Sequence, residues 1–281
     1  MLSILKNAGK GSITYYVGDN PIHVSHLRDC TLICNQNFQI DDSVKQIIVD
    51  DPQLHFYKLS QKVTNTYIFN DNLGYEVGEN CEIHKTATIG VGVKIGDNVE
   101  IGPNVVIYSH TTIGDNVTID ANSTIGTEGM MWTWDNDKKV YLKQLGGVLI
   151  KDGVRICSNC VVVRGSANEL TIIGEGSNLA PGCCIGHGTE IGEHVHFANN
   201  ISTGGSTKVA SYNFVGSGVV FRAGVKVTST DVIIGAGAVV STDIDKSGVY
   251  FGVPARWVKE SMGKFNGMPK WRRWKLTKDL K

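Results

Sequence analysis

His187 is the residue of this sequence that is best placed to act as a proton acceptor. It stands two residues after Ile185 and directly after Gly186, where a side chain would project outward from a turn. An imidazole exchanges its proton near neutral pH and is the commonest general base in enzymes. Gly205 lies 18 residues later and stands two residues after Thr203, as His187 stands two after Ile185. If the chain stacks at that spacing, His187 and Gly205 lie close together on one outer edge; otherwise His187 is an ordinary surface histidine.

Two other groups of side chains belong to the types that bind metals or exchange disulfides. His194 and His196 form a His-x-His pair, but no third ligand stands at a suitable spacing, so we expect no metal site. His196 is instead a candidate for lining a substrate pocket. Cys157 and Cys160 form a Cys-x-x-Cys pair, which can hold a metal or a redox disulfide. Cys160 and Cys183 each stand two residues before an aliphatic residue, in a position that faces inward in a periodic strand, so we expect both to be core thiols.

The elements that must position these residues follow a period of six. A helix needs apolar positions near every 3.6 residues and a strand every second residue, so a strict period of six fits a short strand plus a corner, repeated. Such self-similarity predicts a solenoid, in which each turn buries its aliphatic face against its neighbours and glycine corners supply positive φ angles. The aliphatic positions are Ile83, Ile89, Ile95, Ile101, Ile107, Ile113, Ile119 and Ile125 and, after an interruption, Ile150, Ile156 and Val162, with a slip before Ile173.

This hexapeptide resembles the repeat of the left-handed parallel β-helix acyltransferases, in which three hexapeptides make one triangular coil. The resemblance implies a mainly β fold: a left-handed parallel β-helix of hexapeptide repeats, preceded by a small α/β domain and followed by a short C-terminal helical tail. We therefore divide the chain into a nucleotide-binding-like domain over residues 1–78, a β-helix over 79–256 with an inserted loop at 127–147, and a basic, aromatic tail over 257–281.

The first of these regions carries no hexapeptide phase. Its β-branched and aromatic residues predict short strands over residues 12–17, 31–34 and 46–49. Asp51 and Pro52 predict the start of a helix, with Asp51 as the N-cap and Pro52 at the first helical position. A small α/β domain follows from these elements.

Several phrases resemble the UDP-3-O-acylglucosamine N-acyltransferase family, which acts in lipid A assembly, and together they cover about residues 12–256. GSITYYVGDNPIHVSHL and IIVDDPQLHFYKLSQ resemble its N-terminal uridine-binding domain, and VVVRGSANELTIIG resembles its arginine-containing stretch at a slip in the period. CIGHGTEIG resembles the stretch around its catalytic histidine. The resemblance implies that His187 is the general base and that the backbone N–H of Gly205 stabilises the oxyanion.

The same resemblance implies where a substrate would bind. The pair Tyr15 and Tyr16 lies where the family carries a ring that stacks on uracil, and the segment from Gly126 takes the place of a segment that lines the family's active site. The expected substrate-binding residues are Tyr15, Tyr16, Glu128, Trp132, Arg164 and His196.

Two positions depart from the family pattern and bear on the substrates. His23 replaces a second aromatic residue of the uracil site, and Gly224 falls where the family carries a histidine associated with the acyl-carrier donor. The solenoid also has fewer coils than the lipid A enzyme. We therefore expect a short acyl group, acyl-CoA as co-substrate, and the amino group of a nucleoside-diphosphate-linked amino (deoxy)sugar as acceptor. Arg222, Lys226 and Arg256 are the candidate cofactor-binding residues, near the CoA phosphates.

Three alternatives remain open on the sequence. The nearest is the lipid A enzyme itself, UDP-3-O-acylglucosamine N-acyltransferase, with an acyl-carrier-protein donor. The other two alternatives belong to different classes of protein: a solenoid scaffold without catalytic activity, and a hexapeptide carbonic anhydrase. The phrase around His187 speaks against the scaffold, and the missing third ligand speaks against a zinc enzyme.

Composition narrows the partners and the compartment. Lys+Arg and Asp+Glu both number 27, so no basic field favours nucleic acid. No apolar run is long enough to span a membrane, and the first residues lack the apolar core of a signal peptide. The seven cysteines are odd in number and irregular in spacing, which argues against a disulfide framework. We expect a cytoplasmic homotrimer, because the flat faces of a triangular prism pack around a threefold axis and the family builds its active sites between neighbours.

Overall fold

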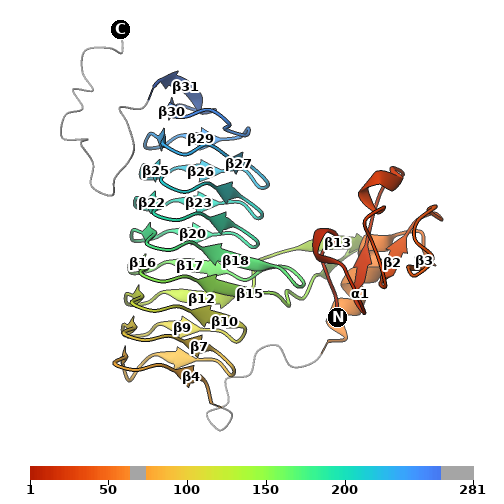
Figure 1. Ribbon diagram of the computed structural model, residues 1–281, viewed down its shortest axis with the longest axis horizontal. Helices are drawn as coiled ribbons and strands as arrows, with labels where there is room; N and C mark the ends of the chain where they lie inside the picture. The colour runs from red at the N-terminus through yellow and green to blue at the C-terminus, as the bar shows by residue number, and fades with distance from the viewer. Residues whose placement is uncertain (64–73, 261–281) are drawn as a thin grey trace.

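The computed structural model describes residues 1–63 and 74–260, which form a parallel β-helix with a small domain at its side (Figure 1). Each solenoid strand pairs in parallel with the strand one coil further along, which is three strands later except where the hairpin or the last coil intervenes, so the chain winds through three sheets in turn. We name each sheet after its first strand, as the β4, β5 and β6 sheets. The expected fold class, a mainly β left-handed β-helix of hexapeptide repeats, is confirmed.

Each coil contributes one short strand to each sheet, and the antiparallel β31 extends the β5 sheet at its end. The β4 sheet holds β4 (Glu76–Val77), β7 (Lys94–Ile95), β10 (Thr111–Ile113), β15 (Gly147–Ile150), β18 (Leu170–Ile173), β21 (Glu190–Ile191), β24 (Lys208–Val209) and β27 (Lys226–Val227). The β5 sheet holds β5 (Glu82–Ile83), β8 (Glu100–Ile101), β11 (Thr118–Ile119), β16 (Arg155–Ile156), β19 (Asn178–Leu179), β22 (His196–Phe197), β25 (Phe214–Val215), β28 (Val232–Ile234), β30 (Gly248–Phe251) and β31 (Arg256–Lys259). The β6 sheet holds β6 (Thr88–Ile89), β9 (Val106–Ile107), β12 (Thr124–Thr127), β17 (Val161–Val163), β20 (Cys184–Ile185), β23 (Ser202–Thr203), β26 (Val220–Phe221) and β29 (Val239–Val240).

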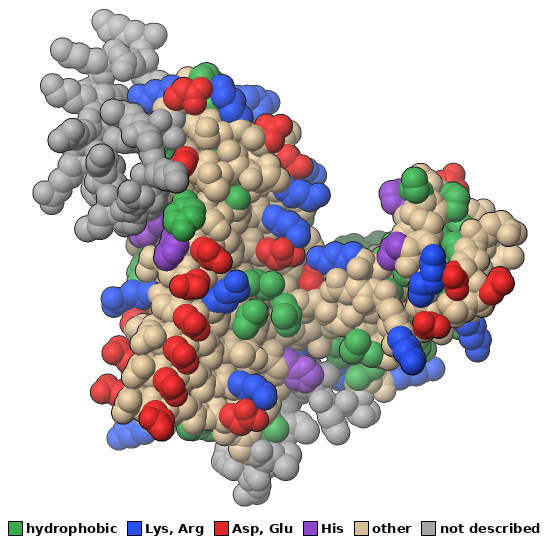
Figure 2. All heavy atoms as spheres, viewed as in Figure 1, with side chains coloured by type: hydrophobic (Ala, Val, Ile, Leu, Met, Phe, Trp, Pro, Cys, Tyr) green, Lys and Arg blue, Asp and Glu red, His purple; other side chains and the backbone are tan. Residues whose placement is uncertain are grey.

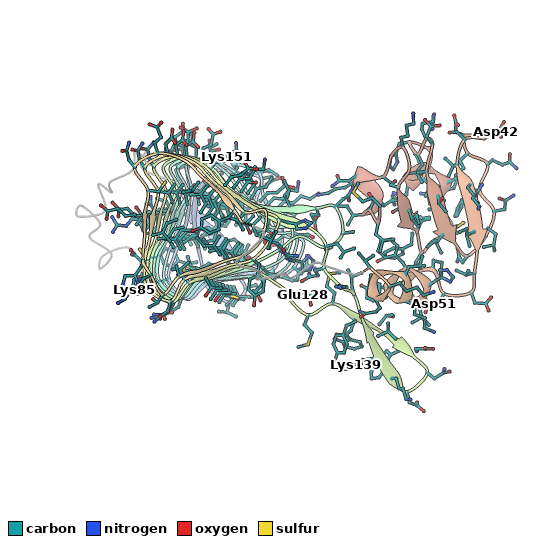
Figure 3. All side chains as sticks on the ribbon, turned by 90° about the horizontal axis from the view of Figure 1, so that it is seen from below. Asp42, Asp51, Lys85, Glu128, Lys139 and Lys151 are labelled. Carbon is teal, nitrogen blue, oxygen red and sulfur yellow. The ribbon has the colours of Figure 1, made fainter. Side chains whose placement is uncertain are left out.

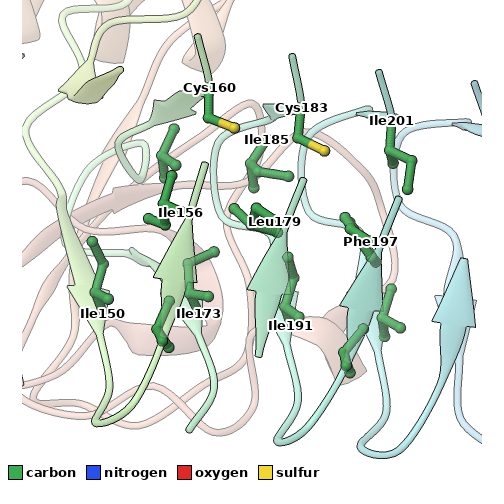
Figure 4. Packing of buried hydrophobic residues seen from close by; sticks show 14 of the residues in the cluster. Ile150, Ile156, Cys160, Ile173, Leu179, Cys183, Ile185, Ile191, Phe197 and Ile201 are labelled. Atoms are coloured by element: carbon green, nitrogen blue, oxygen red, sulfur yellow. The ribbon is translucent and has the colours of Figure 1, made fainter. Parts of the chain in front are cut away.

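The periodic aliphatic residues form one continuous core along the solenoid. Corresponding side chains stack from coil to coil, as the row of Cys160, Cys183 and Ile201 illustrates (Figure 4). All three side chains are fully buried, so the prediction of core thiols at Cys160 and Cys183 is confirmed. Burying each aliphatic side chain stabilises the fold by about 1.5–3 kcal/mol, and a one-residue slip would turn a whole strand inside out. The period therefore fixes the register of the coils.

The corners place two different requirements on their residues. Positive φ falls on asparagines such as Asn98 (φ 55°), which tolerate the left-handed region better than most residues, and on glycines such as Gly92 (φ 69°). The glycine that directly follows an aliphatic residue answers a different need. A Cβ at Gly96 would lie 2.7 Å from the carbonyl carbon of Gly114 in the next coil. Close approach of neighbouring coils, more than positive φ, thus explains these glycines.

Two interruptions of the period protrude on the side of the small domain. The predicted loop at 127–147 contains an antiparallel hairpin of β13 (Trp132–Asp135) and β14 (Lys138–Tyr141). The slip before Ile173 is a second protrusion, since Ile150 pairs with Ile173 and this coil is longer than its neighbours. Its extra residues form the loop of residues 164–169 between β17 and β18.

The small domain has a three-stranded parallel sheet and one α-helix. Its elements are η1 (Leu5–Asn7), β1 (Ile13–Tyr15), η2 (Pro21–His23), β2 (Thr31–Cys34), β3 (Lys45–Ile48) and α1 (Pro52–Gln61). The strands lie within two residues of their predicted bounds. The helix begins as expected, with the Asp51 carboxylate accepting the Leu54 N–H at 2.8 Å.

Helix α1 joins this domain to the β13–β14 hairpin of the solenoid. Lys58 Nζ lies 2.6 Å from Asp135 Oδ2, and Ser60 Oγ accepts the Lys143 N–H at 3.0 Å. Phe56 and Leu142 belong to one buried apolar cluster that spans the junction. Sequence periodicity could not predict this docking, because the hairpin lies outside the repeat.

The domain bounds differ slightly from the expected ones. The solenoid begins at β4 (Glu76–Val77), before the expected residue 79, and its sheet continues to β31 (Arg256–Lys259) rather than ending at 256. The predicted helical tail lies mostly outside the described residues. Across 1–63 and 74–260, no helix has the length and apolarity needed to cross a membrane.

Candidate active site

His187 lies in the turn that leads from β20 in the β6 sheet to β21 in the β4 sheet. We call the stack of these turns, residues 186–188, 204–206 and 222–224, the His187 edge. Because Ile185 pairs with Thr203 in β23, the residue level with His187 in the next coil is Gly205. The structure therefore brings together the two residues expected from their spacing. The His187 side chain is 24% exposed.

Gly205 allows the imidazole of His187 to lie over its backbone. A Cβ at Gly205 would lie 2.1 Å from His187 Nε2. Within the described part of the chain, the Gly205 N–H donates to no acceptor. On another edge the corresponding N–H of Asp97 is held by Asp115 Oδ1 at 2.8 Å, but the register places Ala223 over Gly205, and Ala223 offers no side-chain acceptor. An N–H without a protein acceptor is available to stabilise an oxyanion.

The other side of the imidazole faces a buried carboxylate. His187 Nδ1 lies 3.2 Å from Ser166 Oγ and 3.9 Å from Glu169 Oε2. The Glu169 side chain is only 7% exposed, and Lys6 Nζ of the small domain lies 3.5 Å from Oε1. A Cβ at Gly188 would lie 2.4 Å from this carboxyl group, so a glycine is needed beside His187 for the carboxylate to approach.

The surroundings of Glu169 favour its ionised form. Burial raises the pKa of the Glu169 carboxyl, but His187, the Ser166 N–H and the Lys6 charge together lower the pKa below its usual value. The Ser166 N–H donates to Oε2 at 3.3 Å. An ionised carboxylate only accepts hydrogen bonds, so it favours a proton on the facing Nδ1 and a lone pair on Nε2.

Arg164 is a structural residue, and the expectation that it binds the substrate is wrong. Its side chain is fully buried, which leaves no surface for a substrate to contact. Its Nε donates to the Gly126 carbonyl at 2.8 Å, and a terminal nitrogen donates to the Ser109 carbonyl. Arg164 therefore holds the bases of the two protruding segments together.

The expected residues of the inserted segment lie on the side of the small domain. Glu128 lies where the solenoid meets that domain, and Lys139 lies on the hairpin that projects from the junction (Figure 3). Glu128 Oε1 accepts the Gln144 N–H at 3.2 Å. Trp132 is 37% exposed, with Lys139 Nζ 4.3 Å from its ring centroid. Both residues remain candidates for substrate contact.

Tyr15 and Tyr16 line a pocket of about 360 Å³ in the small domain. The Tyr16 ring lies 5.9 Å from the ring of His23 and 5.7 Å from that of Phe38. The Tyr15 ring packs 4.9 Å from that of Phe56, and burial raises the pKa of Tyr15 to about 12. The pocket is lined by Ile4, Leu5, Tyr15, Tyr16, Val17 and Gln53.

His194 and His196 lie away from the His187 edge. His196 is on β22 in the β5 sheet, where its ring stacks on Phe214 at 5.2 Å, and burial lowers the pKa of His196. His194 lies in the turn after β21, with its ring 5.2 Å from that of Tyr212. In the described ranges, no three His, Cys, Asp or Glu side chains gather in a way that could hold a metal ion.

The three expected cofactor-binding cations are not all together. Arg222 lies on the His187 edge and donates to the Ser241 carbonyl at 2.8 Å, and Lys226 follows on β27. Arg256 lies on β31 in a different sheet. Basic side chains, with acidic ones among them, line the upper solenoid edge that faces the small domain (Figure 2). The register also places Ala223, not Gly224, two coils beyond His187, and neither carries an imidazole.

The repeat itself matches a known family. The family described as Bacterial transferase hexapeptide (six repeats) matches residues 74–108 and 92–127. Residues 74–127 therefore match bacterial transferase hexapeptide repeats. The match lies in the first coils, before the hairpin, and confirms the resemblance drawn from the six-residue period.

Two curated relatives of this chain are named UDP-3-O-acylglucosamine N-acyltransferase. This chain is 31% identical over 142 residues to the enzyme of that name from Delftia acidovorans, and the match covers 49% of this chain and 42% of the relative. It is 37% identical over 112 residues to that of Bordetella avium, with 40% and 30% covered. The chain thus spans less than half of the length of these relatives.

A solved structure shares the same architecture. The UDP-N-acetylglucosamine acyltransferase from Campylobacter jejuni matches with a TM-score of 0.56 and 25% identity, over 65% of this chain and 69% of that one. The structural match extends over more of the chain than the sequence matches do. It supports the hexapeptide-repeat solenoid as the shared element.

Sequence reasoning missed three residues around His187: Ser166, Glu169 and Lys6. Glu169 precedes His187 by one coil length, and this spacing is a signal that could have found it. It lies in the slip of the hexapeptide period, however, where the period assigns no register. Lys6 has no sequence signal, since only the docking of the small domain brings it to the solenoid.

Proposed function

We propose that this chain transfers an acyl group from a thioester to the amino group of a nucleotide-linked sugar. One observation carries the proposal: the His187 ring lies with Nε2 over the bare backbone of Gly205 and with Nδ1 toward the buried Glu169. A base and a free N–H on one edge supply the two groups that acyl transfer needs. The similarity to acyltransferases of nucleotide-linked sugars supports the same chemistry.

The proposed reaction proceeds by direct attack. The sugar amine attacks the thioester carbonyl carbon while His187 Nε2 accepts a proton from the amine, directly or through water. The Gly205 N–H donates to the carbonyl oxygen as negative charge develops there. The C–S bond then breaks and the proton on Nε2 passes to the leaving thiolate. An amide and a free thiol form, and His187 is neutral again.

The small domain supports a nucleotide on the acceptor. Its aromatic pocket fits the stacking of a pyrimidine base, and the names of the curated relatives favour UDP-3-O-acylglucosamine over other nucleotide-linked amino sugars. We therefore propose this acceptor, which belongs to the alternative expected from the sequence. His23 beside Tyr16 is the change that would admit a different base.

Replacing Tyr16 with alanine is expected to raise the KM for the nucleotide sugar by roughly 5–100-fold, with kcat little changed. Stacking of one base on an aromatic side chain contributes about 1–3 kcal/mol. Steady-state kinetics with varied acceptor measures the change. Tyr212→Ala, an exposed tyrosine of the solenoid, is the matched control and should leave KM unchanged. An unchanged KM in Tyr16→Ala would place the nucleotide elsewhere.

The donor is proposed to be an acylated carrier protein. The names of the relatives favour the lipid A enzyme as the model for this chain. The family resemblance implies that this enzyme uses an acyl-carrier-protein donor, in place of the acyl-CoA that we expected from the sequence. Both donors present a pantetheine arm with phosphate, and Arg222 and Lys226 are candidates to meet it. A competition assay with acyl-CoA and acyl-carrier protein at equal concentration tests the proposal. Preference for a short acyl-CoA on another nucleotide amino sugar would restore the original expectation.

We also propose that the protein assembles as a homotrimer. The support is the triangular section of the solenoid, whose flat faces can pack around a threefold axis (Figure 3). Sedimentation velocity should give the mass of three chains, and a stable, active monomer would refute the assembly.

A further inference from the structure

A short segment at the start of the chain touches two sites at once. Ile4 and Leu5 form part of the wall of the aromatic pocket, beside Tyr15 and Tyr16. The same segment continues as η1 (Leu5–Asn7) toward the solenoid. The pocket proposed for the nucleotide base and the His187 edge are therefore joined through a few consecutive residues.

On the solenoid side this segment binds the loop of residues 164–169 through hydrogen bonds and an ion pair, and we call these contacts the clasp. The Ile4 N–H donates to Asn168 Oδ1 at 3.1 Å. Asn7 Nδ2 donates to the Asn168 carbonyl at 3.2 Å, and Asn168 Nδ2 donates back to the Asn7 carbonyl at 3.3 Å. Lys6, between them, lies 3.5 Å from Glu169 Oε1. Every residue from Ile4 to Asn7 thus contacts either the pocket or the loop.

The clasped loop carries both groups that face Nδ1 of the general base. Ser166 and Glu169 lie within it, and the Glu169 carboxylate is buried between Lys6 and His187. We propose that Glu169 is a positioning residue that fixes a proton on Nδ1 of His187, and that the segment 4–7 holds Glu169 in place. The nucleotide pocket then helps to organise the base, since both share this segment.

The charged groups that face Glu169 come from the small domain and from the solenoid. Lys6 Nζ lies 3.5 Å from Oε1 of Glu169, whereas His187 Nδ1 lies 3.9 Å from Oε2. Lys6 Nζ also lies 3.6 Å from Glu190 Oε1, which Lys208 holds at 2.8 Å. Lys6 is 52% exposed, so solvent screens its effect more than that of the buried Glu169.

The inference rests on the proposed function, because it assigns a role to the proposed base. The first test is kcat of the full chain carrying Glu169→Gln or Lys6→Gln, with KM for the acceptor measured alongside. Glu169→Gln should lower kcat at neutral pH roughly tenfold or more, a part of the 10²–10⁴-fold effect of a general base. KM for the acceptor should change little, because Glu169 is buried behind the imidazole. Lys6→Gln should lower kcat by a smaller factor, since the Lys6 side chain is 52% exposed.

Lys10→Gln is the matched control, since it removes the same charge from the same stretch of chain. It should leave both kcat and KM unchanged. A merely structural role for Glu169 would raise KM together with the loss of kcat. That result, or an unchanged kcat in Glu169→Gln, would overturn the proposal.

A second measurement does not depend on activity. Long-range ¹H–¹⁵N spectra of protein labelled at histidine report which ring nitrogen of His187 carries the proton. The wild type should have the proton on Nδ1 in its neutral form, and Glu169→Gln should lose that preference. If the tautomer is as expected but no acceptor is acylated, the proposed function fails and the positioning stands. If the wild type instead carries the proton on Nε2, the positioning by Glu169 is wrong, whatever the enzyme acylates.

Discussion

Replacing His187 with alanine is expected to lower kcat by roughly 10²–10⁴-fold, the usual effect of losing a positioned acid–base group. Nε2 lies over Gly205, where the amine would lose its proton, and Glu169 lies behind the ring on the Nδ1 side. Steady-state kinetics on the proposed acceptor measures the loss. Thermal unfolding should change little, because the side chain is 24% exposed and does not belong to the core.

His194→Ala is the control for this prediction. It removes an imidazole from the same coil, but its ring packs beside Tyr212 at another edge of the prism. We expect activity within a few-fold of wild type. If His194→Ala proves as damaging as His187→Ala, the base has been placed on the wrong edge.

Replacing Gly205 with alanine is expected to lower kcat by roughly 10²–10³-fold, the range seen when one oxyanion donor is lost. The added Cβ would lie 2.1 Å from His187 Nε2, so the imidazole must leave its position and the N–H is covered. Kinetics with saturating donor and acceptor measures the effect. Gly9→Ala is the control, because a Cβ there meets no atom within 4 Å.

A double variant separates the two causes of this loss. When His187 is already alanine, the added methyl group at Gly205 no longer meets an imidazole. If displacement of the ring is the main cause, Gly205→Ala should cost little in that background, as coupled residues are non-additive. A full further loss would assign the effect to the Gly205 N–H itself. An active single variant Gly205→Ala would contradict both roles.

Much of the site was predictable because the hexapeptide period fixes the register of the coils. Ile185 and Thr203 are in phase, so His187 and Gly205 had to fall level with each other on one edge. The same phase placed Cys160 and Cys183 in the core, where both are fully buried. The period predicts which side chains are buried, and their burial fixes where the remaining side chains of each coil lie.

The remainder lies where the period breaks. Ser166 and Glu169 lie in a loop that the repeat does not describe, and their approach to His187 depends on the clasp from Ile4 to Asn7. Arg164 illustrates the opposite error, because its match to the family's arginine-containing stretch suggested substrate contact, whereas its side chain is fully buried. Contacts between the small domain and the solenoid join residues far apart in sequence, and no local pattern encodes them.

Mass spectrometry of the reaction product tests the central claim most directly. Purified full-length protein is incubated with UDP-3-O-acylglucosamine and acyl-carrier protein, in parallel with acyl-CoA and with the His187→Ala variant. The account predicts an acceptor that gains one amide-linked acyl group with the wild type, and at least about 100-fold less product with the variant. No amide product from either donor on any nucleotide-linked amino sugar, or equal product from the His187→Ala variant, would contradict it.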